Sequence, residues 1–246
     1  MRTTSRLAAA AAVILGAAGL AATASGQVLG GTSELGVTHT PLVAPVCPPN
    51  VSAASCTIIL TRVTAIESAR DGIAYPTRVR QAGRITDFSV GLSQLSSSKS
   101  TQNSYIQYLD SNYGGPPRVG ITVLRQGPWK RGQFRWTAVA SSPMYLVQSY
   151  LGSVVQIPLQ STIEVKPGEA IAITTPTWAP ILSINVDSKQ FSYRQSRTWN
   201  CTNPPSSSQA QLTAGAVTNY ACTYPGTRLE YSATEDLYPL GKNPGF

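Results

Sequence analysis

The feature that most constrains the fold is a two-residue alternation of apolar and polar side chains. From Cys56 onward this alternation, or short apolar runs, recur between Gly, Pro and Ser residues. Such segments are typical of β-strands, and no segment sustains the 3.6-residue spacing of an amphipathic helix. The expected strands are Thr57–Ile66, Ile73–Arg80, Ile85–Leu95, Val119–Gln126, Gln133–Ser141, Tyr145–Leu159, Thr162–Val165, Ala170–Thr174, Ile181–Val186, Phe191–Arg197, Val217–Tyr224 and Arg228–Ser232.

Many short strands without helices predict an all-β, antiparallel β-sandwich of the jelly-roll type. The expected sandwich is a single domain over residues 56–235, followed by a C-terminal tail at 236–246. Lys166-Pro167-Gly168-Glu169 lies between two of its strands and predicts a type II hairpin turn, because Pro presets φ and Gly accepts a positive φ.

The first 24 residues predict an export signal. Two arginines precede an apolar run at 7–22, and a small-x-small cleavage site follows at 22–24. We expect cleavage near Ser25 or near Gln27, and a secreted protein. The apolar run is too short and too rich in Ala for a membrane span, so we expect none.

Residues 25–55 are rich in Gly, Ser and Pro, and we interpret 25–46 as a linker or tail that leads to a first disulfide loop. Four cysteines in an exported chain indicate two disulfides, for which three pairings exist. We favour Cys47 with Cys56 and Cys201 with Cys222, because each pair closes a short polar loop. Close Cys or His pairs are missing from the sequence, so we predict no zinc site, no other metal and no cofactor.

The charge of the chain is moderately basic. Nineteen Lys and Arg face 11 Asp and Glu, and removal of the signal segment lowers the formal charge from +8 to +6. Charged residues make up 12% of the chain, which is typical of exported β-proteins with weakly charged faces. We therefore expect no nucleic-acid partner. The sequence does not indicate an oligomeric state.

Three segments carry a resemblance. The strands Gly83–Val90 and Pro117–Arg125, followed by the turn at Val165–Glu169, resemble the order found in small exported bacterial β-sandwich proteins of unknown function. Over residues 56–235 the chain is also loosely similar to non-catalytic carbohydrate-binding sandwiches. No binding residue is carried over from either group, because the chain matches no site motif of theirs.

Motifs for catalysis are missing from the sequence, and we predict no catalytic residue. His39 is the one histidine of the chain and lies in the irregular N-terminal stretch, so sites built on Ser-His-Asp or Cys-His are excluded. A pair of carboxylates would suffice for glycoside hydrolysis. The nearest clusters are Glu67 with Asp71, and Glu230 with Glu235 and Asp236, which we interpret as turn caps or solubility charges at strand ends.

The first candidate binding element is a long loop. Residues Ser96–Pro117 carry Tyr105, Tyr108 and Tyr113, and long loops on a rigid sandwich often bind ligands. The alternative is a strap whose tyrosines cover one end of the core. Asp110–Gly114 begins like a calcium loop but lacks the later Glu, so we favour an Asx-type turn there.

The second candidate is the hairpin Arg125–Trp136. Trp129, Lys130 and Arg131 lie at its turn, where cations and an exposed aromatic ring suit a glycan. Phe134 and Trp136 share one strand face, and the alternative is a hairpin with core aromatics and solvated cations.

These features favour an exported, non-catalytic β-sandwich that binds a polysaccharide or another envelope component. Two alternatives remain open. One is a structural or adhesive surface protein whose flat sheet face pairs with itself or a partner, which an uncovered long edge strand would support, and the other is a carboxylate-dependent glycan hydrolase or lyase.

Overall fold

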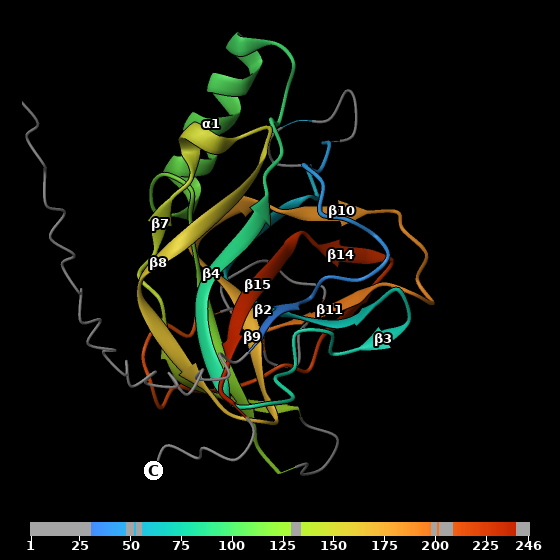
Figure 1. The fold of residues 1–246 in the computed structure, drawn as a ribbon. Coiled ribbons are helices and arrows are strands. Elements are labelled where there is room, and N and C mark those ends of the chain that lie inside the picture. Colours follow the sequence, from blue (N-terminus) through green and yellow to red (C-terminus); the bar gives the residue numbers. More distant parts are fainter. Residues whose placement is uncertain are drawn as a thin grey trace, which may run out of the picture.

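The structure is a computed structural model that describes residues 31–47, 52, 56–128, 134–197, 201 and 209–239. These residues form an all-β sandwich in a single domain, which confirms the predicted fold class (Figure 1). The expected signal segment, residues 1–24, lies outside the described residues.

The smaller sheet has four antiparallel strands. Its order is β1 (Thr32–Leu35), β15 (Tyr231–Leu237), β4 (Gly83–Gly91) and β8 (Val154–Val165). The N-terminal segment is thus not a plain linker in its described part, because β1 pairs with β15 at the other end of the chain. A four-residue strand with so distant a partner shows no local pattern that would reveal it.

The larger sheet has nine strands and curls into a half-barrel. Seven strands follow one another in it, with β3 added beside β2 and β7 beside β5, and a separate ribbon joins β10 to β14. In sheet order the bounds are β12 (Val217–Asn219), β6 (Arg135–Ser141), β5 (Arg118–Gln126), β9 (Glu169–Pro180), β2 (Ile59–Arg70), β11 (Ser192–Gln195) and β13 (Thr223–Pro225), then β3 (Ile73–Ala74), β7 (Tyr145–Leu146), β10 (Leu182–Ile184) and β14 (Thr227–Leu229).

The main core lies between the two sheets. On β5, the inward residues Val119, Ile121 and Val123 are fully buried in it. Leu124 points to the other face of the same sheet and packs in a second cluster with Trp136. The central strands of the larger sheet are therefore covered on both faces.

The expected absence of helices is wrong. The segment expected as a loop forms α1 (Lys99–Tyr113), which projects from one end of the sandwich (Figure 1). Ser98 caps its start by accepting a hydrogen bond from the Thr101 amide, and Gly114 ends it with a φ of 89°. Leu109 is the one buried residue of α1, so the helix lacks the aliphatic stripe by which such elements are recognised.

The region that resembled a calcium loop is the last turn of this helix. Asp110 accepts a hydrogen bond of 2.9 Å from Nε1 of Trp178, which is fully buried on β9. The carboxylate therefore fastens α1 to the sheet instead of ending a calcium loop.

The turn at Lys166–Glu169 forms as expected, but it does not close a hairpin. The Glu169 amide donates to the Lys166 carbonyl at 3.1 Å, and Gly168 has a φ of 89°. The flanking strands β8 and β9 lie in different sheets, so the turn is a corner between the two layers.

Both predicted disulfides are present, Cys47–Cys56 and Cys201–Cys222. They enclose chain separations of 9 and 21 residues, respectively.

We expect the double variant Cys201→Ser/Cys222→Ser to lower the free energy of unfolding by about 3 kcal/mol, because the longer loop gains more chain entropy in the unfolded state. The matched variant Cys47→Ser/Cys56→Ser should lose less, since its loop is shorter. Urea unfolding of both proteins measures the difference, and a larger loss from the Cys47–Cys56 pair would contradict this expectation.

Candidate functional site

Three of the acidic residues found in the sequence, Glu67, Glu230 and Glu235, are buried instead of lying at exposed strand ends. Glu67 lies inside β2, Glu230 lies between β14 and β15, and both are fully buried. The interpretation of these two residues as turn caps or solubility charges is therefore wrong. Each of these buried carboxylates lies beside an arginine that is also buried, Arg70 for Glu67 and Arg228 for Glu230.

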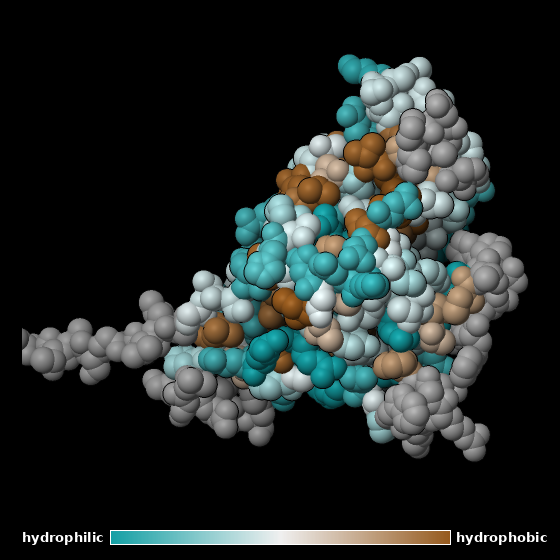
Figure 2. Space-filling view, turned by 90° about the vertical axis from the view of Figure 1, so that its right-hand side faces the viewer, coloured by the Kyte–Doolittle hydropathy of each residue, from teal (hydrophilic) through white to brown (hydrophobic). Residues whose placement is uncertain are grey.

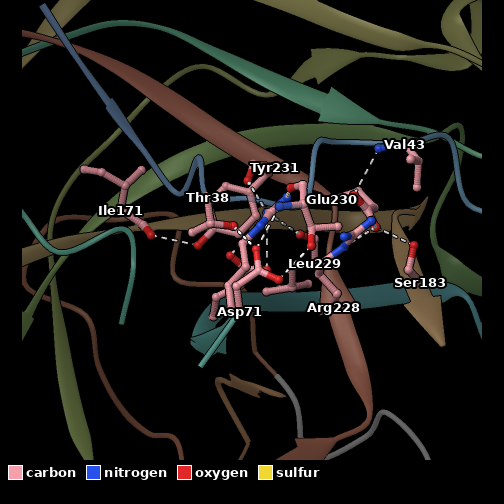
Figure 3. A network of polar contacts seen from close by, with 12 residues as sticks. Thr38, Val43, Asp71, Ile171, Ser183, Arg228, Leu229, Glu230 and Tyr231 are labelled. Carbon is pink, nitrogen blue, oxygen red and sulfur yellow. Dashed lines mark hydrogen bonds and ion pairs between the residues drawn. The ribbon is translucent and has the colours of Figure 1, made fainter. Parts of the chain in front are cut away.

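Glu230 is the centre of the polar network in Figure 3. Its Oε1 accepts hydrogen bonds from Nε and Nη2 of Arg228, at 2.7 and 2.6 Å, and from the hydroxyl of Ser183. Its Oε2 accepts from the amide of Val43 at 3.2 Å. Both carboxylate oxygens are thus occupied by protein donors.

Glu67 pairs with the second buried arginine. Nη1 of Arg70 lies 3.4 Å from the Glu67 carboxylate and also donates to the carbonyls of Leu229 and Tyr231. Burial raises the pKa of Glu67 to about 8, against the opposing effect of Arg70 and together with repulsion from Glu230.

Asp71 holds the N-terminal segment against this network. Its slight burial would raise its pKa, but hydrogen bonds from the side chains of Thr38 and Thr40 and from the Thr40 amide lower the pKa to about 2. Arg70 adds a bond from Nη2 to the Thr40 carbonyl at 3.0 Å. The exposed His39 lies within the segment that these bonds fix.

The remaining two acids of these clusters differ in exposure. Glu235 is 1% exposed, and burial raises its pKa to about 7. Asp236 lies at the surface, where its carboxylate is 3.6 Å from Arg84. The structure brings Glu67 and Glu230 together, but in the interior, where they hold strands and the N-terminal segment in place.

A hollow among the described residues lies where two pairs of strands diverge. β10 pairs with β14, and β11 pairs with β13. These two strand pairs, which we call the two limbs, line the hollow together with Ile59–Thr61 of β2. The hollow has a volume of about 680 Å³, and we call it the fork groove. Its strands lie on the side of the molecule that Figure 2 presents, where apolar atoms form small separate groups among polar ones.

One limb of the fork groove carries a cluster of polar and aromatic groups. The rings of Tyr193 and Tyr224 stack with centroids 4.7 Å apart. Gln195 Nε2 donates to the Tyr224 hydroxyl at 2.8 Å, and Arg197 Nη1 donates to it at 3.4 Å. Burial raises the pKa of Tyr193 far above its usual value, so its hydroxyl stays neutral.

The opposite limb contributes aliphatic side chains together with Asn185 and Thr227, and the junction is a tight turn. Leu182 and Ile184 line the groove from β10. At the junction, the amide of Gly226 donates to the Phe191 carbonyl at 2.9 Å, and the Val186 amide donates to the Gly226 carbonyl at 3.2 Å. Gly226 has a φ of 70°, a conformation that glycine adopts without strain.

The predicted hairpin is present in its described part. β5 and β6 pair antiparallel, Trp136 is fully buried, and Phe134 packs half-buried beneath Arg194 at 3.9 Å. Arg125 bonds to Glu169 at 2.6 Å. Trp129, Lys130 and Arg131 lie outside the described residues, so their role stays a prediction.

The three candidate tyrosines lie on α1 instead of a loop. Tyr105 and Tyr113 pack half-buried against the core beneath the helix, and Arg62 lies 5.9 Å from the ring of Tyr113. Tyr108 is exposed. None of the three lines the fork groove as the structure describes it.

Sequence reasoning missed the residues of the fork groove. Tyr193, Gln195 and Arg197 follow one another at every second position of the expected strand Phe191–Arg197, which places them on one face. That alternation was the available signal in the sequence. Tyr224 completes the same face but lies 29 positions after Gln195, so no local pattern connects the two.

Comparisons of the chain with protein families, with curated proteins and with solved structures find no match. Among the described residues, no helix is both long enough and apolar enough to cross a membrane.

Proposed function

We propose that the protein is an exported, non-catalytic binding protein for a polysaccharide or another envelope component, and that the fork groove holds the ligand. The observation that carries this proposal is the combination of stacked tyrosines, an amide and a guanidinium on one limb with aliphatic side chains on the other. Sugars present both an apolar ring face and polar hydroxyl groups, so a groove of this mixed chemistry suits them.

The chemistry of the groove supports binding without hydrolysis. The described residues that line it include no Asp, Glu or His, whereas glycoside hydrolysis uses two carboxylates. Export is supported by the signal pattern of residues 1–24, and the two disulfides are compatible with an oxidising environment.

The adhesive alternative rests on β8, an edge strand of 12 residues. This edge is poorly suited to pairing with another chain. Pro158 lies within it, and the pairing with β4 moves from Ile163 to Pro158 over two residues of β4, which leaves a bulge between them. Proline and bulges are features that protect sheet edges from association.

We expect Tyr224→Ala to weaken glycan binding about tenfold or more, because it removes a ring and a hydrogen-bonding hydroxyl from the groove. A glycan array that includes cell-wall and envelope polysaccharides identifies the ligand, and titration calorimetry measures the affinity. Tyr150→Ala is the matched control, since Tyr150 is exposed on the 3-10 helix η2 (Gln148–Tyr150), away from the groove.

Trp129→Ala and Lys130→Ala/Arg131→Ala test the hairpin in the same assay. If these variants lose affinity while Tyr224→Ala binds normally, the ligand lies on the hairpin and the assignment of the groove is wrong. If the wild-type protein binds none of the polysaccharides, the proposed function is wrong.

A further inference from the structure

The hydroxyl of Tyr224 accepts two hydrogen bonds from the side chains beside it. It receives one bond from the amide nitrogen of Gln195 and one from the guanidinium of Arg197. Both of these groups are obligatory donors, so the phenol oxygen must be the acceptor in each bond. A phenol hydroxyl can donate one hydrogen bond in addition to those that its oxygen accepts.

The oxygen is the acceptor in both bonds, so the hydrogen of the hydroxyl is engaged in neither of them. Among the described residues, Tyr224 donates no hydrogen bond to a protein acceptor. Bonds received by a hydroxyl polarise it and strengthen it as a donor. The groove thus offers one strong donor, which selects a ligand group that accepts.

The charge around this donor favours an anionic acceptor. Arg197 is 8% exposed and lies beside the hydroxyl, and the described lining of the groove contains no carboxylate. Hydrogen bonds to an ionised acceptor are about twice as strong as those to a neutral one. A carboxylate combines both properties, because it accepts a hydrogen bond and its negative charge is attracted by the nearby guanidinium.

We propose that the fork groove recognises an acidic sugar, whose carboxylate accepts the hydrogen of the Tyr224 hydroxyl beside the Arg197 guanidinium. This inference rests on the proposed function and names the class of glycan. The ring of Tyr224 and its stacking on Tyr193 would serve any sugar, while the hydroxyl and Arg197 distinguish a uronic acid from its neutral counterpart.

The test compares uronic-acid polysaccharides with the same polymers after reduction of their carboxyl groups to alcohols, arrayed in pairs. We expect the protein to bind an acidic form, and to bind its reduced partner with an affinity that is lower by a factor of about ten or more. Tyr224→Phe keeps the stacked ring and removes the hydroxyl. We expect this variant to bind the acidic form as weakly as the wild type binds the reduced one, while Tyr150→Phe leaves affinity unchanged.

The outcomes separate the two proposals. Equal binding to acidic and reduced forms, or full affinity of Tyr224→Phe for the acidic form, would overturn the acidic-sugar inference and leave glycan binding intact. Absence of binding to every polymer in both forms would overturn the proposed function as well. Thermal unfolding of Tyr224→Phe checks that the fold is retained.

Discussion

Replacement of Glu230 by Ala is expected to lower the free energy of unfolding by about 3–5 kcal/mol, which is the usual loss when one partner of a buried ion pair is removed. The variant leaves the guanidinium of Arg228 buried without its carboxylate. It also deprives Ser183 and the Val43 amide of their acceptor. Urea unfolding followed by circular dichroism measures the loss.

Asp236→Ala is the matched control for this experiment. Asp236 also pairs with an arginine, but the side chains of Arg84 and Asp236 are 48% and 37% exposed. An exposed pair contributes about 1 kcal/mol or less. If the two variants lost similar stability, the network around Glu230 would not stabilise the fold as we describe.

The wild-type protein is expected to lose stability as the pH rises from about 5 to about 8. The folded chain keeps a proton on Glu67 up to a pKa of about 8, whereas the unfolded chain releases it near the ordinary value of 4.5. Between these values the folded state binds more protons, so rising pH favours unfolding. Each pKa unit corresponds to about 1.4 kcal/mol, so the loss amounts to a few kcal/mol. Glu235, with a pKa of about 7, adds to the same trend.

Glu67→Gln tests this expectation directly, because glutamine resembles the protonated acid. The variant should match the wild type near pH 5 and be the more stable protein at pH 9. The control Glu34→Gln changes an exposed carboxylate that accepts a bond from Thr234, and it should leave the pH profile unchanged. A wild-type stability that is constant from pH 5 to 9 would show that Glu67 is ionised in the folded state.

The sequence predicted those parts of the fold that are encoded locally. The alternation on strands such as β5 and the turn at Lys166–Glu169 depend on neighbouring residues, and both are found in the structure. The short polar loops between cysteines likewise identified the correct disulfides. Helix α1 escaped detection because its inner face is short and half-buried: Ile106 and Leu109 are its aliphatic residues there, and Tyr105 and Tyr113 complete it.

The candidate site was harder to predict because its parts come from distant segments. Glu230 and the amide of Val43 are 187 positions apart, so no local window shows that contact. Arg228, two positions before Glu230, was visible in the sequence, but its burial with the acid was not. The fork groove likewise joins β2, β10, β11 and β13, and the Tyr224 hydroxyl meets Gln195 and Arg197 from another strand segment there.

The pairing of β1 with β15 has a consequence for how the chain folds during its synthesis. The chain is synthesised from its N-terminus, so Thr32–Leu35 emerges long before Ala233–Asp236, the residues with which it pairs. The smaller sheet therefore cannot close until almost the whole chain is available. Strand pairings between residues far apart in the sequence form slowly, so we expect β1 to join the smaller sheet late in folding.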